Sequence, residues 1–413
     1  MYFHAGLTMP KSLIPRCLLA GMFFTTLMVA VVASPPKVTP VKLGHAGIRP
    51  QAVMDDTGIV HIVQASAEVR GELNYVRHVP GEGGFSEPIE VLQTAEDMAA
   101  SFNMTVGKDG RVHVITRPNP MYSKKILGAE AFDTMFKSKA RFFVLRYMLH
   151  SRLNDAGDAF EEEANLVGDT IGFEGVGAIV ADPKSAQVYA FWPGQLEPGP
   201  EMERDMYMAV SKDEGKTWSN PKKLDIDIQG NCRCCPIQAT MDADRNLFLV
   251  YRNSVKTSPS SWDKDTFLMV SRDAGETWSK RLIEKWENCG CPGAPYSMAT
   301  SDDGVFFGYS TRGTSSFARV ADNLKPVSVP DSGKPATRPN VATNGKGQVL
   351  LAWTEAQDVL WQVYDKGGQP IEGCLGRLEK VAARWSNPAV VATQAGDFLL
   401  YYDSQNTINK PGA

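Results

Sequence analysis

A strand–turn–strand pattern recurs seven times along this chain of 413 residues and constrains its fold more than any other feature. Each copy has a Pro- or Gly-marked entry, an apolar-alternating run, a tight polar turn and a second alternating run, which together predict a β-hairpin. The copies begin at Arg49, Ser101, Glu174, Pro236, Ala294, Arg338 and Asn387. The sequence therefore predicts an all-β protein built from repeats.

Further strands follow most of these hairpins. A third is clearest in DMYMAVS from Asp205 and DTFLMVS from Asp265, and a fourth occurs in segments beginning at Ser86, Ser219 and Leu324. Four-stranded units spaced roughly 40–60 residues apart predict a single β-propeller with six or seven blades. The segment VTPVKL from Val38 precedes the first hairpin, and pairing it with the last hairpin would close the ring through the N- and C-terminal strands.

Two octets between third and fourth strands share the template Ser-x-Asp-x-Gly-x-Thr-Trp, and weaker copies begin at Leu153 and at Asp365. In this template the Asp can accept hydrogen bonds from its own turn, the Gly allows a positive φ, and the Trp packs against the sheet. We therefore interpret the octets as structural turns. Their defining residues are Ser211, Asp213, Gly215, Thr217 and Trp218, and Ser271, Asp273, Gly275, Thr277 and Trp278.

The octets are those known as the Asp-box, or bacterial neuraminidase repeat, and nearly all of the mature chain resembles the sialidase-like propellers that carry it. It is most similar to secreted bacterial sialidase-family proteins that join Asp-boxes to a Cys-x-Cys-Cys stretch and a strand ending in Tyr-Arg. Here those residues are NCRCCPIQATMDADRNLFLVYRN from Asn231. The wider family implies an exo-α-sialidase-type glycosidase with an arginine triad for the sugar carboxylate, a Tyr–Glu nucleophile pair and an Asp acid/base.

The sequence departs from the family pattern at the expected catalytic positions. Arg49 stands directly before Pro50, one place out of register with the family's Arg-Ile-Pro entry. The loop that should supply the catalytic Asp offers only Glu68 and Glu72. The resemblance is therefore stronger for the fold than for the chemistry.

Candidate site residues lie at the ends of the inner strands, where propeller ligands usually meet near the central axis. The candidates are Arg49, Arg252, Arg312, Arg338, Tyr309 and Glu355, and Arg117, Tyr401 and Asp403 occupy comparable places. A mouth lined by several arginines would suit an anionic sugar or another carboxylate. The alternative is that each arginine binds a local acid or carbonyl at a blade junction. His61 and His113, which occupy matched strand positions, are interpreted as packing residues.

Five cysteines fall at the entries of two consecutive hairpins, so they should lie close together. They are Cys232, Cys234 and Cys235 before Pro236, and Cys289 and Cys291 before Pro292. In an exported protein the default is disulfide formation. The alternative is a thiolate site for zinc or copper(I), because soft sulfur ligands select those ions. No other cofactor is implied.

The N-terminus predicts export. Lys11 and Arg16 precede an apolar run that ends in small residues at Ala33, which is typical of a signal peptide over residues 1–33, with the propeller over residues 34–413. An uncleaved membrane anchor is the alternative. Cleavage would move the net charge from −4 to −6 and place the chain in the periplasm or outside the cell. This acidity argues against a nucleic-acid partner.

One insertion, over about residues 118–140, interrupts the repeat pattern. Phe132, Met135 and Phe136 fall at helical spacing within it. It is either a packed surface excursion or a lid over the propeller face.

We therefore expect an exported propeller that acts on carbohydrate, with sialidase-type hydrolysis of terminal acidic sugars as the first hypothesis. Two alternatives remain. One is a non-catalytic propeller that binds glycan or protein, and the other is a propeller with a thiolate metal site.

Overall fold

The computed structural model describes residues 34–95, 99–137, 146–172, 175–228, 230–232, 235–287, 295–320, 325–383 and 386–404. The predicted signal peptide, the end of the insertion, Cys234, Cys289 and Cys291 lie outside these residues. Within the described ranges, no helix has the length and apolar character needed to cross a membrane.

Seven sheets are the blades of the propeller; six are antiparallel, and the seventh joins an antiparallel hairpin to one parallel strand. Blade 1 contains β2 (Gly47–Met54), β3 (Val60–Ser66), β4 (Leu73–His78) and β5 (Ile89–Glu90). Blade 2 contains β6 (Ala99–Val106), β7 (Val112–Pro118), β8 (Leu149–Arg152) and β9 (Ala164–Asn165). Blade 3 contains β10 (Ala178–Ala181), β11 (Val188–Gly194), β12 (Asp205–Ser211) and β13 (Lys222–Lys223). Blade 4 contains β14 (Gln238–Met241), β15 (Leu247–Arg252), β18 (Thr266–Ser271) and β19 (Ser279–Glu284).

The remaining three blades complete the ring. Blade 5 contains β20 (Ser297–Ser301), β21 (Gly304–Thr311), β22 (Thr314–Arg319) and β23 (Val327–Ser328). Blade 6 contains β24 (Ala336–Thr343), β25 (Val349–Glu355), β26 (Asp358–Tyr364) and β27 (Gly376–Leu378). Blade 7 contains β28 (Ala389–Ala392), β29 (Phe398–Tyr402) and, at its outer edge, β1 (Val38–Lys42).

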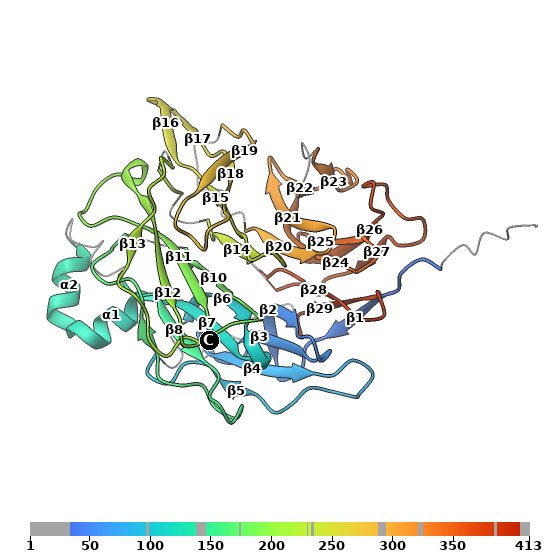
Figure 1. Cartoon of the computed structure of the whole chain (residues 1–413), viewed down its shortest axis with the longest axis horizontal. Helices are drawn as coiled ribbons and strands as arrows, with labels where there is room; N and C mark the ends of the chain where they lie inside the picture. Colours follow the sequence, from blue (N-terminus) through green and yellow to red (C-terminus); the bar gives the residue numbers. More distant parts are fainter. Residues whose placement is uncertain are drawn as a thin grey trace, which may run out of the picture. The chain divides into compact units, whose positions relative to one another are not determined.

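The ring closes as the sequence predicts. The innermost strands β2, β6, β10, β14, β20, β24 and β28 each contact the next, and β28 contacts β2 (Figure 1). β1 pairs in parallel with β29, with Val38 opposite Phe398. All seven predicted hairpins are confirmed, and the blade count is seven rather than six.

The core is distributed around the ring rather than gathered at one centre. An apolar cluster fills each junction between neighbouring blades; the cluster between blades 3 and 4, for example, contains Phe191 and Leu249. Each blade buries both of its faces against its neighbours, so apolar residues on either side of its strands fill the two adjoining junctions.

The Asp-box turns have the predicted structural role. Asp213 accepts hydrogen bonds from Ser211 Oγ (2.8 Å), Thr217 N (2.9 Å) and Thr217 Oγ1 (2.6 Å), and Gly215 has a φ of 81°. The second turn repeats this geometry, with Asp273 in place of Asp213. These hydrogen bonds, chiefly those from the threonine, lower the pKa of each Asp to about 2.

Each Asp-box also packs against the preceding blade. Trp218 meets the ring of His150 edge-on at 4.8 Å, and a Cβ on Gly215 would lie only 2.6 Å from the same ring. His150 in turn lies 3.3 Å from His113, and both are buried. In the second box Trp278 meets Phe191 of blade 3 edge-on at 5.6 Å. The turns therefore fasten one blade to the next.

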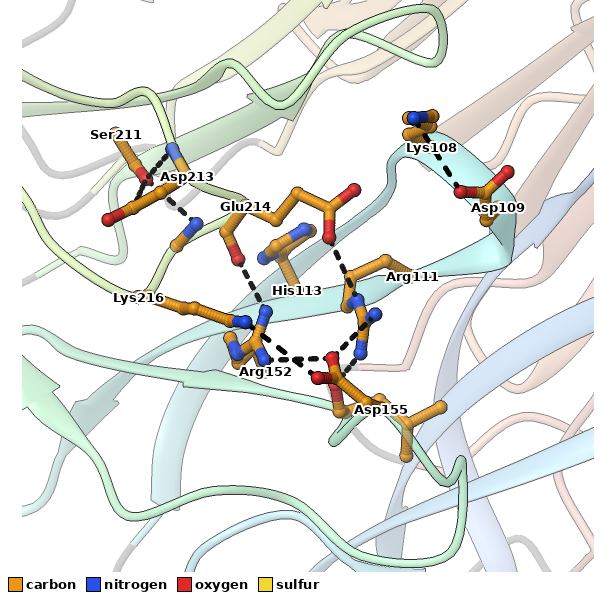
Figure 2. Close-up of polar contacts among 12 residues, drawn as sticks. Lys108, Asp109, Arg111, His113, Arg152, Asp155, Ser211, Asp213, Glu214 and Lys216 are labelled. Atoms are coloured by element: carbon orange, nitrogen blue, oxygen red, sulfur yellow. Dashed lines mark hydrogen bonds and ion pairs between the residues drawn. The ribbon is translucent and has the colours of Figure 1, made fainter.

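The weak copy at Leu153 is used differently (Figure 2). Its Asp155 contacts Arg111 (2.8 Å), Arg152 (3.2 Å) and Lys216 (3.7 Å) instead of stabilising its own turn. Arg152 Nη1 also donates to the carbonyl of Glu214 inside the first Asp-box. Figure 2 shows this network joining blade 2 to the Asp-box of blade 3. The copy at Asp365 keeps the original role, accepting from two backbone N–H groups.

The insertion forms two short helices at the outside of the ring (Figure 1), α1 (Pro120–Leu127) and α2 (Ala129–Lys137). Tyr122 of α1 enters the apolar cluster between blades 1 and 2, and Lys125 donates to the carbonyl of Thr94. These contacts agree with a packed surface excursion rather than a lid. A second excursion, the hairpin of β16 (Val255–Ser258) and β17 (Ser261–Asp263), is not evident from the sequence.

Candidate functional site

Two Arg-Pro pairs occupy matched places at the start of inner strands. Arg49-Pro50 lies in β2 and Arg338-Pro339 lies in β24, each within a β-bulge. The two arginines have φ values of 53° and 57°, in the left-handed region that disfavours residues with a Cβ. Bulges redirect side chains, and backbone strain of this kind concentrates at binding sites. Because the same Arg-Pro bulge occurs on blades 1 and 6, the two neighbours of blade 7, this part of the ring is a candidate binding site.

Three arginine charges converge here. Burial and, to a smaller extent, the charge of Arg49 together lower the pKa of Arg338 to about 10. Burial also lowers the pKa of Arg49, where Asp403 opposes the shift and the charge of Arg70 adds to it. Arg70 is exposed and lies in the loop between β3 and β4. The charge of Arg49 is therefore repelled by that of Arg70 and repels that of Arg338.

Blade 7 supplies the polar groups between these arginines. Asp403, which follows β29 and is 3% exposed, accepts from the backbone N–H of Arg49 (2.8 Å) and from Ser386 Oγ (2.8 Å). Its second oxygen accepts from the N–H of Ala383. Burial raises the pKa of Asp403 to about 6. Asp403 therefore holds the strained backbone of Arg49 in place.

We call Arg49, Arg70, Arg338, Asn387 and Asp403 the arginine cluster. Asn387 Oδ1 accepts from Arg338 Nη1 at 3.4 Å. The cluster holds three guanidinium groups and one carboxylate whose charge is disfavoured by burial. Such a positive excess, presented by groups with several N–H donors, suits a carboxylate or another oxyanion.

Arg252 and Arg312 lie apart from this cluster. Arg252 is fully buried between blades 4 and 5, where it donates to the carbonyls of Lys264 (2.8 Å) and Ser310 (3.1 Å). Arg312 is exposed in the turn between β21 and β22 and donates to the carbonyl of Lys285 at 3.0 Å. Both therefore bind local carbonyls at a blade junction.

Tyr309 is buried at the same junction as Arg252, and Glu355 is buried on blade 6. Tyr309 packs in the apolar cluster between blades 4 and 5, where burial and the nearby carboxylate of Glu284 raise its pKa. Glu355 Oε1, at the end of β25, accepts from Ser332 Oγ (2.8 Å) and Trp353 Nε1 (3.3 Å). The structure therefore distributes the predicted catalytic residues over several places.

Arg117 and Tyr401, at comparable strand positions, also have local contacts. Arg117 donates to the carbonyl of Pro118, and Tyr401 Oη is 2.7 Å from His78 Nδ1. His61 contacts Tyr75 Oη (2.7 Å) within blade 1, as expected of a packing residue.

Two of the five clustered cysteines are described. Cys232 and Cys235 are buried, and their sulfur atoms are 3.4 Å apart, longer than the roughly 2.05 Å of a disulfide bond. Disulfide or metal binding by the whole set stays a prediction, because Cys234, Cys289 and Cys291 lie outside the described residues.

Two hollows lie elsewhere on the ring. One, of about 360 Å³, is lined by residues of β12, β13 and the segment around Met202, and another, of about 320 Å³, lies beside Asp263 and Asp265. Neither includes a residue of the arginine cluster. Because carboxylates outnumber cations around both, the arginine cluster is the better candidate for an anionic ligand.

The sequence predicts only some members of the arginine cluster. Arg49, Asn387 and Arg338 each precede a proline at an inner-strand entry, so the repeat alignment could have grouped them. Arg70 stands in an irregular loop that no repeat position marks. Only the folded ring brings it beside Arg49.

Comparisons with known proteins identify the fold. No protein-family model matches the chain, and no curated protein matches it. Among solved structures, the BP39L lectin from Burkholderia pseudomallei superposes with a TM-score of 0.57 at 11% identity, covering 89% of this chain and 99% of the lectin. The α-L-arabinanase from Penicillium chrysogenum, complexed with arabinobiose, superposes at 0.51 with 12% identity, covering 81% of this chain and 98% of the enzyme.

A microbial sialidase, Hadza Hz136, superposes at 0.47 with 13% identity, covering 83% of this chain and 76% of the sialidase. At a TM-score below 0.5, this superposition does not indicate the function of the chain. Identities this low establish the β-propeller fold and leave the function to the geometry of the site.

Proposed function

We propose that the arginine cluster binds a carbohydrate through a carboxylate or another anionic group. The observation that carries this proposal is that Arg70 and Arg338 both lie within repulsive range of Arg49, beside a carboxylate disfavoured by burial. An anionic ligand would relieve that repulsion, and each guanidinium can donate two parallel hydrogen bonds to it.

Two solved propellers of similar fold support a carbohydrate as the carrier of that anion. Of the two solved structures described above with TM-scores over 0.5, one is a lectin and the other an arabinanase complexed with arabinobiose. The predicted signal peptide would place the site in the periplasm or outside the cell, where acidic glycans are accessible.

A glycan array probed with the purified full chain tests the proposal. Saturable binding should favour sugars with carboxylate or sulfate groups over their neutral counterparts. Arg338→Ala and Arg70→Ala should each weaken binding at least tenfold, since each removes one of three positive charges. Arg377→Ala is the matched control, because Arg377 pairs with Asp358 on outer strands of blade 6. A blank array, or equal binding of acidic and neutral sugars, would refute the proposal.

A second candidate function is sialidase-type hydrolysis of a terminal acidic sugar. It is favoured by the placement of Tyr309 beside the carboxylate of Glu284, the pairing of residue types that such chemistry uses. We rank carbohydrate binding above hydrolysis for two reasons. Tyr309 is only 1% exposed, and it lies at the junction of blades 4 and 5, whereas the arginine cluster that would hold the anionic sugar lies on blades 6, 7 and 1.

Turnover of an aryl sialoside and a panel of other acidic glycosides separates the two functions. Hydrolysis requires release of the aryl group and its loss in Tyr309→Phe and Glu284→Gln. The absence of turnover across the panel, alongside saturable binding on the array, would exclude the hydrolase and retain the binding protein.

A further inference from the structure

Asp403 is a buried carboxylate within the arginine cluster. Its Oδ1 accepts from the backbone N–H of Arg49 (2.8 Å) and from Ser386 Oγ (2.8 Å), and its Oδ2 accepts from the N–H of Ala383. Among the described residues, Arg49 is the charged group that acts on this carboxylate. An anion bound by the cluster would therefore share the charge of Arg49 with a second negative group.

Two negative charges beside the same cation oppose each other. A like charge disfavours the ionised form of a carboxylate, and burial strengthens this effect because the surroundings screen poorly. Burial already raises the pKa of Asp403 to about 6, although its hydrogen bonds and the charge of Arg49 oppose the shift. A bound anion would raise this pKa further, so binding favours the protonated form of Asp403.

Ser386 can accommodate that proton. Its Oγ donates to Asp403 Oδ1, accepts from the N–H of Arg49 (3.2 Å) and lies 3.5 Å from the carbonyl oxygen of Asn387. A protonated Oδ1 can donate to Ser386 Oγ, whose own hydrogen can then turn to the carbonyl of Asn387. Oδ1 still accepts from Arg49 and Oδ2 from Ala383. Asp403 therefore keeps its hydrogen-bonding partners when it is protonated.

Asp403 also positions Arg49. The N–H that donates to it belongs to a residue with a φ of 53°, and an acceptor at this place offsets part of the backbone strain. Asp403 thus has two separable effects on the site. Its hydrogen bond to Arg49 is kept in both protonation states, whereas its negative charge opposes an anionic ligand and is lost on protonation.

We propose that Asp403 takes up a proton when the arginine cluster binds its anion, so that the site binds oxyanions more tightly as the pH falls from 7.5 to 5. The proton comes from the solvent and forms an O–H bond on Oδ1, and no other covalent bond changes. The inference rests on the proposed function, because it concerns the same site, and it adds regulation of that site by pH.

Titration calorimetry of the full chain with inorganic sulfate tests the proposal. Sulfate keeps its charge of −2 over this pH range, so any pH dependence comes from the protein. If binding raises the pKa of Asp403 by about one unit, affinity should be about fivefold higher at pH 5 than at pH 7.5. Titrations at pH 6.5 in two buffers of different ionisation enthalpy should show uptake of a fraction of a proton per sulfate bound.

Two variants separate the charge of Asp403 from its hydrogen bond to Arg49. Asp403→Asn keeps an oxygen that accepts from Arg49, so it should bind sulfate about tenfold more tightly than the native chain at pH 7.5, with no pH dependence and no proton uptake. Asp403→Ala lacks that acceptor and should bind at least fivefold more weakly than Asp403→Asn at both pH values. Asp182→Asn is the matched control, because Asp182 is also buried and hydrogen-bonded but lies on blade 3.

The outcomes distinguish this inference from the proposed function. Equal sulfate affinity of the native chain at both pH values, or undiminished proton uptake in Asp403→Asn, would overturn the inference and leave carbohydrate binding intact. Absence of sulfate binding at both pH values would also overturn it, and the glycan array then decides the proposed function separately. If Asp403→Ala does not fold, Asp403→Asn and the proton count still decide.

Discussion

Replacing Asp213 by Ala should loosen the junction between blades 2 and 3. The substitution removes three accepted hydrogen bonds, from Ser211 Oγ and from the backbone and side chain of Thr217. Hydrogen bonds to a charged group contribute about 1.5–3 kcal/mol each when shielded, but this carboxylate is only partly buried, so about 1 kcal/mol each is appropriate. The expected loss is about 3 kcal/mol.

That loss converts into a measurable change in melting temperature. With an unfolding entropy of about 2.1 cal/mol/K per residue, the unit Pro35–Ala413 has about 0.8 kcal/mol/K in total, so 3 kcal/mol corresponds to about 4 °C. Differential scanning calorimetry at pH 7 measures it. Asp244→Ala, in the exposed turn between β14 and β15, is the control and should leave the melting temperature within about 1 °C.

The pH dependence provides an independent check. Because the folded pKa of Asp213 is about 2, below its unfolded value, its contribution is present above pH 4 and is lost as the pH falls towards 2. The difference between the native chain and Asp213→Ala should therefore shrink between pH 4 and pH 2. An unchanged melting temperature at pH 7, or a difference that does not shrink in acid, would refute the structural role of the Asp-box.

Three further predictions address stability. Burial lowers the folded pKa of His150 to about 3, so the native chain loses stability as the pH falls below about 6.5, and His150→Phe should make denaturant midpoints less sensitive to pH between 6.5 and 4. Asp155→Asn should lower the melting temperature at low ionic strength and have a smaller effect at 1 M salt, because Asp155 is exposed and salt screens its attraction to Arg111 and Lys216; an equal effect at both ionic strengths would contradict this. Arg252→Ala should lower the unfolding free energy by about 3–5 kcal/mol in urea titrations, since it empties a buried site and leaves two carbonyls unpaired, and a loss under 1 kcal/mol would contradict that account.

The sequence predicts the propeller because every blade repeats the same local pattern. The hairpin from Arg338 and the hairpin from Asn387 each alternate apolar residues about a polar turn, and neighbouring blades must bury both faces. Closure by β1 is also predictable, since an unpaired strand at one terminus matches a missing strand at the other.

The candidate site is only partly predictable, because it depends on which chain segments the ring brings together. Arg49 and Arg338 are visible as matched positions in the repeat, yet Arg70 comes from an irregular loop. Arg252 shows the converse. It ends a second strand as a ligand-binding residue would, but the side chain turns into the junction with blade 5 and binds Ser310. Side-chain direction at a blade end is decided by the neighbouring blade, which no local pattern specifies.

The central claim is that the arginine cluster recognises a negatively charged group on a sugar. Calorimetric titration of the full chain with the tightest-binding acidic glycan and its carboxyl-reduced neutral counterpart, repeated with Arg338→Ala, tests it most directly. We expect saturable binding of the acidic form, at least tenfold weaker binding of the neutral form, and little discrimination between them in the variant. Equal affinity of the native chain for both forms, or full discrimination by Arg338→Ala, would contradict the claim.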